Sequence, residues 1–246
     1  MHRKLILLTL VSLFILSAMV VTLAVAQPRT VGVTLGDWFK YGDITGSWSS
    51  NDPDAVFPLL ELNETEWMLM SVEDVSGTKI TFQSTVHFTN GTEETGSGHI
   101  DIDTGDGNMT LMAISANLDA NDTIYSSPGY STQKINETIV RTYPDGIRDT
   151  NYWNITGEYN VTGFYQYISM NWYWDRSSGI FVEMAQEYTS QTENYTTTWS
   201  VILKITESNV WVIPEFPTYT PLLIAFAILT VSIVMIKRRL LKMPIH

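Results

Sequence analysis

Two uncharged apolar segments lie at the ends of this 246-residue chain and restrict folding in water to the region between them. The C-terminal segment runs from Pro221 to Ile236 and is followed at once by Lys237-Arg238-Arg239. An apolar run that stops at a basic cluster is typical of a membrane span whose basic end stays in the cytoplasm. The sequence therefore predicts a linker at 211–220, a transmembrane helix at 221–236 and a cytoplasmic basic tail at 237–246.

The N-terminal segment has the layout of a secretory signal. His2-Arg3-Lys4 precede an apolar stretch from Leu5 to Ala26, and Ala24-Val25-Ala26 fits the small-x-small pattern of a cleavage site. We expect residues 1–26 to form a helical signal peptide, or an uncleaved N-terminal anchor, because the stretch is longer than a usual signal core. Region 27–210 is then an extracellular domain, on a single-pass protein after cleavage and on a two-pass protein without it.

The charge distribution favours the same topology. Six of the 14 basic residues lie outside the two apolar segments, so that eight remain in the middle region against all 26 acidic residues, a net charge of −18 there. Basic flanks around an acidic middle follow the positive-inside rule. An acidic domain repels phosphate, and this argues against a nucleic-acid partner and leaves the lipid bilayer and envelope proteins or glycans.

The middle region is rich in N-glycosylation sequons. Thirteen asparagines lie between Gln27 and Trp211, and eight of them are followed by any residue but proline and then by threonine. Two or three would be expected if the third residue were random. We interpret the set as a surface kept for N-glycans, which requires an extracellular location. The eight asparagines are Asn63, Asn90, Asn108, Asn121, Asn136, Asn154, Asn160 and Asn194.

Hydrophobic alternation with a period of two residues predicts a mainly β domain. From Lys79 to Thr89, apolar residues alternate with polar ones, and Asn90-Gly91 follows as a hairpin signal. Because the chain has no cysteine, burial of a core must hold this domain together. Further strands are expected at 38–48, 66–75, 109–115, 134–142, 148–159, 163–174, 180–188 and 195–207. Their spacing favours a single antiparallel meander, which forms a curved sheet or an open barrel.

Two local details complete the fold prediction. A three-residue loop at 90–92 places Phe82 opposite Ile100 and Ile80 opposite Ile102, which keeps all four side chains on one face. One short helix is expected at 114–124, where the alternation breaks, and a loop at 49–60.

The sequence holds little that indicates catalysis. It shows no Ser-His-Asp order, nucleophile elbow or Gly-rich phosphate loop, so we expect a protein without catalytic activity and without a cofactor. Asp101, Asp103 and Asp106 have the close spacing of calcium ligands but depart from the helix-loop-helix pattern, and a tight Asp- and Gly-rich turn explains them as well. Two histidines in the domain, without a third ligand, do not indicate zinc.

Aromatic residues concentrate in the C-terminal strands. Trp153, Trp172, Trp174 and Trp199 lie on predicted strands, where they form either the core or a face that binds a ligand. The leading hypothesis is a membrane-anchored, N-glycosylated surface protein with a structural or interaction role at the cell envelope. The alternative is a module that binds a lipid or a glycan on a concave, aromatic-rich sheet.

The C-terminal region resembles a known sorting signal. Val212-Ile213-Pro214-Glu215-Phe216-Pro217, then an apolar run and Lys237-Arg238-Arg239, is similar to the PEF-type C-terminal signal of archaeal surface proteins. The resemblance implies that Pro214, Glu215 and Phe216 are recognised by an archaeosortase, which cuts near the tripeptide and transfers the protein to a lipid anchor. The segment 221–236 is then either a retained span or a signal that is removed.

Two shorter likenesses lie in the domain. Residues 31–42, from Val31 to Gly42, look like the start of uncharacterised archaeal surface domains. Residues 174–183, from Trp174 to Glu183, resemble a recurrent hairpin of curved-sheet lipoprotein carriers. The second likeness implies a concave sheet that holds an apolar ligand.

Overall fold

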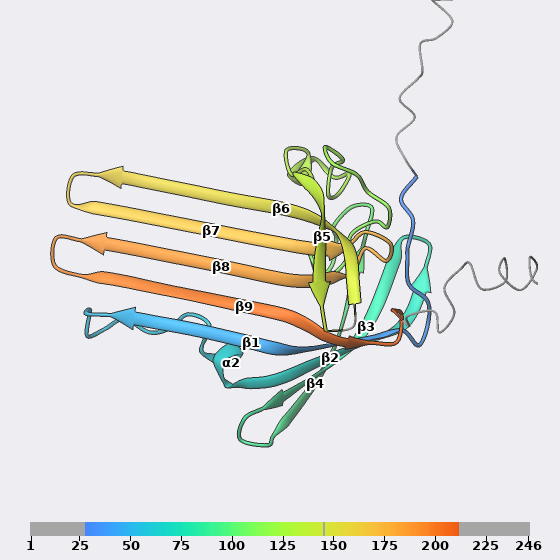
Figure 1. Ribbon diagram of the computed structural model, residues 1–246, viewed down its shortest axis with the longest axis horizontal. Helices are drawn as coiled ribbons and strands as arrows, with labels where there is room; N and C mark the ends of the chain where they lie inside the picture. Colours follow the sequence, from blue (N-terminus) through green and yellow to red (C-terminus); the bar gives the residue numbers. More distant parts are fainter. Residues whose placement is uncertain (1–27, 145, 212–246) are drawn as a thin grey trace, which may run out of the picture.

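The computed structural model describes residues 28–144 and 146–211, which form one open, antiparallel sheet of nine strands (Figure 1). The strands are β1 (Trp38–Ser50), β2 (Thr65–Ser76), β3 (Lys79–Phe88), β4 (Glu93–Asp101), β5 (Glu137–Tyr143), β6 (Gly146–Val161), β7 (Phe164–Asp175), β8 (Phe181–Thr192) and β9 (Thr196–Ser208). A short helix, α2 (Leu60–Glu64), and a 3-10 turn, η1 (Pro128–Tyr130), complete the regular elements. The prediction of a mainly β, antiparallel sheet is confirmed.

The chain builds this sheet from two meanders that meet in its middle. The strand order is β4-β3-β2-β1-β9-β8-β7-β6-β5, so neighbouring strands are consecutive in the chain except where β1 pairs with β9. The first and last strands are joined by eleven residue pairs, from Phe39↔Ser208 to Ser50↔Thr197. The outermost strands, β4 and β5, lie on opposite edges of the sheet, which is not closed.

Local sequence explains most of the strands and turns. Val, Ile, Thr, Tyr, Phe and Trp fill the strands, and these side chains pack well on a pleated surface. Gly77 and Gly163 have φ values of +61° and +79° in the β2–β3 and β6–β7 turns, a conformation that glycine adopts without strain. In the β7–β8 turn, the Asp175 carboxylate accepts bonds from the Ser178 backbone N–H and from the hydroxyls of Ser177 and Ser178.

One long connection covers half of one sheet face. Residues 102–136, called here the cover segment, link β4 to β5 across the sheet and gather at one end of the long strands (Figure 1). The Trp174 indole N–H donates to Leu111 O at 2.8 Å, and the Asn151 amide donates to Leu118 O at 2.9 Å. We call the covered side the inner face. Its core is fully buried and includes Phe39, Tyr41, Phe82, Ile124, Tyr125, Trp174, Phe181 and Ile205.

The helix and the strand predicted within the cover segment are wrong. Residues 109–115 form no strand and 114–124 no helix; the α-helix of the described residues is α2, which follows a loop at 51–59. Leu111, Asn117 and Asn121 have positive φ values, which interrupt both kinds of element. The backbone N–H groups bond distant partners instead: Ile114 donates to Gly179 O, Ala116 to Thr30 O and Asn117 to Arg176 O.

The predicted pairing of β3 with β4 is also wrong, by two residues. Ile80 lies opposite Ile100, and Phe82 lies opposite Gly98, because the loop lies one residue earlier, at 89–91, and is closed by the Phe88 N–H, which donates to Thr92 O at 2.9 Å. The Asn90 side chain stabilises this turn by accepting bonds from the Thr92 backbone N–H at 2.9 Å and hydroxyl at 2.7 Å. Both registers keep Ile100 on the inner face, so the prediction of the face is correct.

Candidate functional site

The inner face divides into a covered half and an open half. β6 to β9 and β1 pair in register, so their inner side chains form rows that cross five strands. One row that packs into the core beside the open half consists of Ile44, Leu203, Met184, Trp172 and Trp153. Beyond it the long strands continue toward the β6–β7 and β8–β9 turns (Figure 1), and Phe57 and Asn63 lie over Gly46 on the inner side of β1. The open half of the inner face therefore offers the space for a binding surface on this sheet.

The open half of the inner face carries a row of half-buried aromatic and aliphatic side chains. Trp48 pairs with Trp199, Trp199 with Tyr188, and Tyr188 with Ile168. The Tyr188 and Trp199 rings stack with their centroids 5.4 Å apart and an angle of 16° between their planes. The ring centroids of Phe57 and Trp48 lie 5.6 Å apart. We call Trp48, Trp199, Tyr188 and Ile168 the aromatic row.

The four tryptophans proposed from the sequence as a ligand face occupy different environments. Trp174 is fully buried and Trp153 is 7% exposed, and their ring centroids lie 6.4 Å apart in the core. Trp172 packs against Trp174 and Phe181. Trp199 alone of the four belongs to the open half. Sequence reasoning missed Trp48 and Tyr188 as its neighbours, because their proximity depends on the β1–β9 and β8–β9 registers.

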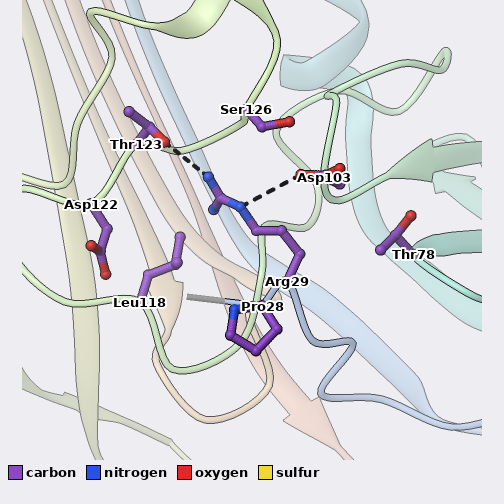
Figure 2. Close-up of a pocket in the computed structure, with 8 residues that line it drawn as sticks. All are labelled: Pro28, Arg29, Thr78, Asp103, Leu118, Asp122, Thr123 and Ser126. Carbon is purple, nitrogen blue, oxygen red and sulfur yellow. Dashed lines mark hydrogen bonds and ion pairs between the residues drawn. The ribbon is translucent and has the colours of Figure 1, made fainter. Parts of the chain in front are cut away.

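A pocket of about 570 Å³ lies where the N-terminal residues of the domain meet the cover segment (Figure 2). Arg29 reaches across it, donating to the Thr123 hydroxyl at 2.9 Å and to Ile124 O at 3.2 Å, with Asp103 3.8 Å from its Nε. Burial lowers the pKa of Arg29, and the nearby carboxylates of Asp103 and Asp122 oppose this effect. Because the Arg29 guanidinium bonds Thr123 and Ile124, Arg29 links the N-terminal residues of the domain to the cover segment.

A buried ion cluster lies on the opposite, outer face. β5 crosses the ends of the neighbouring strands (Figure 1), and its Arg141 donates to both carboxylate oxygens of Glu183 at 2.7 Å. Lys204 Nζ lies 3.7 Å from the same carboxylate, and the Tyr143 hydroxyl donates to it at 3.2 Å. The Arg141 guanidinium also lies 4.2 Å from the Tyr173 ring centroid. The Glu183 side chain is only 6% exposed, so this cluster fixes β5 onto the sheet.

Burial and charge in this cluster shift the pKa values of Tyr143 and Arg141. Burial raises the pKa of Tyr143, and the Glu183 carboxylate raises it further. The pKa of Arg141 is raised as well: burial works to lower it, but the adjacent Glu183 carboxylate outweighs that effect. Arg141 is therefore held as a cation beside Glu183 and Tyr143 as a neutral donor, an arrangement suited to holding structure.

The three aspartates of the calcium candidate have separate partners. Asp101 caps the turn after β4, accepting bonds from the Asp103 backbone N–H at 2.9 Å and the Thr104 N–H at 3.4 Å. Asp103 pairs with Arg29. Asp106 takes part through its backbone, whose N–H donates to the Thr104 hydroxyl. Among the described residues, no group of three or more His, Asp or Glu side chains is placed to hold a metal ion.

Seven of the eight sequon asparagines are exposed, and Asn154 is half-buried. Asn160 and Asn194 lie beside the turns at the far end of the long strands. Asn154 and Asn160 alternate along β6 with the inner residues Trp153, Ile155 and Tyr159, which places both on the outer face. Asn63 lies beside Gly46 at the β1 margin, and the remaining four, Asn90, Asn108, Asn121 and Asn136, lie in turns and the cover segment.

The predicted terminal segments lie outside the described residues, and so does the Pro214-Glu215-Phe216 motif. Over residues 28–144 and 146–211, the structure shows no helix with the length and apolarity that a membrane crossing requires. Trp211 is the last described residue and is 8% exposed, packed 5.6 Å from the Phe39 ring and 4.0 Å from the Arg148 guanidinium. Trp211 therefore fixes the C-terminal end of the described residues in the core.

Comparison with known proteins adds no family. No protein-family model matches this chain, and no curated protein matches its sequence.

Proposed function

We propose that this chain is a membrane-anchored, N-glycosylated protein of the cell surface with an interaction role and no catalytic activity. The placement of the sequons carries the proposal: seven of eight asparagines are exposed, and none occupies an inner-face position on β6 to β9. Glycans need exposed asparagines and an extracellular location. Sequons produced by threonine-rich strand composition alone would fall on both faces of the long strands.

The C-terminal tether gives the domain an orientation. Nine residues, 212–220, separate the buried Trp211 from the proposed span at 221–236, and an extended chain of this length reaches at most about 30 Å. The covered end of the sheet is therefore held near the bilayer. The β8–β9 turn lies a strand length away, about 40 Å from the other end of β9. The open half points outward, toward other components of the envelope.

Processing of the C-terminus belongs to the same proposal. An archaeosortase-like enzyme would recognise Pro214, Glu215 and Phe216 and exchange the span for a lipid anchor. Either outcome leaves the domain outside the cell on a short tether.

Protease treatment of intact cells tests the topology. With an epitope tag after His246, external protease should degrade the domain while the tag stays protected until the cells are lysed. If the sorting signal is removed, the tag will separate from the domain in untreated cells, and Glu215→Ala should keep the two joined. A domain that resists external protease on intact cells but is degraded after lysis would contradict the proposal.

A further inference from the structure

The open half of the inner face has the composition of a surface that binds a neutral ligand. The aromatic row is flanked toward the core by Gly46, Val201, Gln186, Met170 and Ile155, and toward the turns by Ser50, Thr197, Ser190, Gln166 and Tyr159. None of these side chains is charged, although the middle region has a net charge of −18. Charged partners therefore find no complementary group on this face.

The arrangement of the rings indicates what kind of neutral ligand fits. The Tyr188 and Trp199 rings stack nearly parallel across neighbouring strands, and both side chains stay partly exposed. Amides and hydroxyls of Gln186, Gln166 and Ser190 stand beside them. Aromatic planes bordered by neutral hydrogen-bonding groups match a sugar, which has an apolar face and hydroxyl edges.

We propose that the aromatic row binds a neutral oligosaccharide chain laid across the strands. The inference rests on the extracellular placement proposed above and adds a site and a ligand class to it. The row runs over β1, β9, β8 and β7, and Gly157 continues the same line on β6. At about 4.8 Å between strands, five strands span about 19 Å, which suits a chain of sugars better than a single ring.

The same face is less suited to two other occupants, a lipid acyl chain and a second copy of this chain. An acyl chain would cover the amides of Gln166 and Gln186 without offering them a hydrogen bond, which costs free energy at each buried group. A second copy would bring two strongly acidic domains together. The two sequons on β6 agree with this choice, because Asn154 and Asn160 direct their glycans to the outer face and leave the inner face of β6 bare. Asn63 lies over Gly46, so a glycan there borders the β1 end of the row.

Binding by the glycosylated full chain in neutral lipid nanodiscs tests the inference. The probes are cellohexaose, mannohexaose and the hexamer of N-acetylglucosamine, with an oligogalacturonate as the anionic comparison. Titration calorimetry should detect binding of at least one neutral hexasaccharide and not of the oligogalacturonate. Trp199→Thr and, separately, Tyr188→Thr should weaken that binding at least tenfold.

A matched control removes an aromatic ring from the other face. Tyr167 lies on β7 next to Ile168, half-buried on the outer face, so Tyr167→Thr should leave binding unchanged. Covalent footprinting of the wild-type chain supplies a readout that needs no variant: the bound hexasaccharide should protect Trp199 and Tyr188 but not Tyr167.

Three results would overturn the inference. The first is no binding of any neutral hexasaccharide, and the second is binding that Tyr167→Thr weakens as much as Trp199→Thr does. The third is that Trp199→Thr abolishes self-association or phosphatidylcholine binding while sugar binding stays intact. None of these results bears on the cell-surface topology, which the protease experiment tests separately.

Discussion

At the scale of single residues, the ionic contacts of Glu183 dominate the outer face. Its side chain is 6% exposed and has Arg141, Lys204 and Tyr143 as partners. Removing its charge while keeping its shape leaves two cations near a group that no longer neutralises them. The loss is limited by the partial exposure of Arg141 and Lys204, which keep 29% and 33% of their side-chain surface in water.

We expect Glu183→Gln to lower the free energy of unfolding by about 2–3 kcal/mol, measured by urea denaturation. Glu187→Gln is the matched control, because Glu187 lies on the same strand with an exposed side chain and should change stability by less than about 0.5 kcal/mol. Equal losses in the two variants would show that the cluster does not secure β5.

Asp101 gives the domain an acid-sensitive contact. Burial works to raise the pKa of its carboxyl, but hydrogen bonds from the Asp103 N–H, the Thr78 hydroxyl and the Thr104 N–H, with the Lys79 charge, lower it overall. A carboxyl with a lower pKa in the folded state stabilises the fold at pH values above its unfolded pKa. That contribution disappears as the pH falls through the folded pKa.

The variant Asp101→Asn should therefore lose less stability than the wild type on acidification from about pH 5 to pH 2. The two unfolding curves should converge at the acidic end, as followed by tryptophan fluorescence. Asp43→Asn, which changes an exposed carboxyl on β1, is the control. Parallel curves for Asp101→Asn and the wild type would refute this role.

At the scale of elements, the cover segment determines where the core lies. It approaches the β7–β8 turn so closely that a Cβ on Gly179 would collide with the Ile114 carbonyl oxygen, and Gly179 has a φ of +72°. Gly77, in the β2–β3 turn, has a φ of +61°, and a Cβ added there would have no neighbouring atom within 4 Å. The two glycines therefore share a backbone conformation and differ in their surroundings.

Alanine variants of these two glycines distinguish the cost of backbone strain from the cost of a steric clash. Gly77→Ala should cost about 1–2 kcal/mol of unfolding free energy, the usual penalty of a left-handed residue with a side chain. Gly179→Ala should cost clearly more and should increase hydrogen exchange in the cover segment, because Ile114 N–H bonds Gly179 O. Similar costs in both variants, with the cover segment still protected, would contradict the packing described here.

Sequence patterns were reliable where the contacts are local. Alternation and turn residues located β1, β2, β3 and β6 to β9 to within a few residues, because each reports on its own strand. The cover segment failed this reasoning, since its backbone groups bond Thr30, Arg176 and Gly179 far away in the sequence. The β3–β4 register failed because Gly98 faces Phe82 to leave room for Asn108 and Met109, which only the folded cover segment places there.

At the scale of the whole molecule, the β1–β9 pair is the feature that sequence could not predict. It joins residues about 150 positions apart and puts Trp48 beside Trp199. The candidate binding surface depends on this strand pair. The sequence shows how many tryptophans there are, but it does not show which of them lie in the buried cluster and which lie in the aromatic row. The predictions of secretion, of a membrane tether and of glycosylation came from composition and spacing, which require no knowledge of strand order.

We propose that the sheet is displayed outside the cell, with glycans on its outer face, on its turns and beside β1, and with no sequon on the inner face of β6 to β9. Site-resolved mass spectrometry of glycopeptides from the native, membrane-bound protein tests it most directly. We predict glycans on the exposed asparagines, with Asn160 and Asn194 among them, and a lower occupancy at Asn154, whose amide donates to Asn171 at 2.9 Å. Unmodified asparagines at all eight sequons of the native protein would contradict the claim.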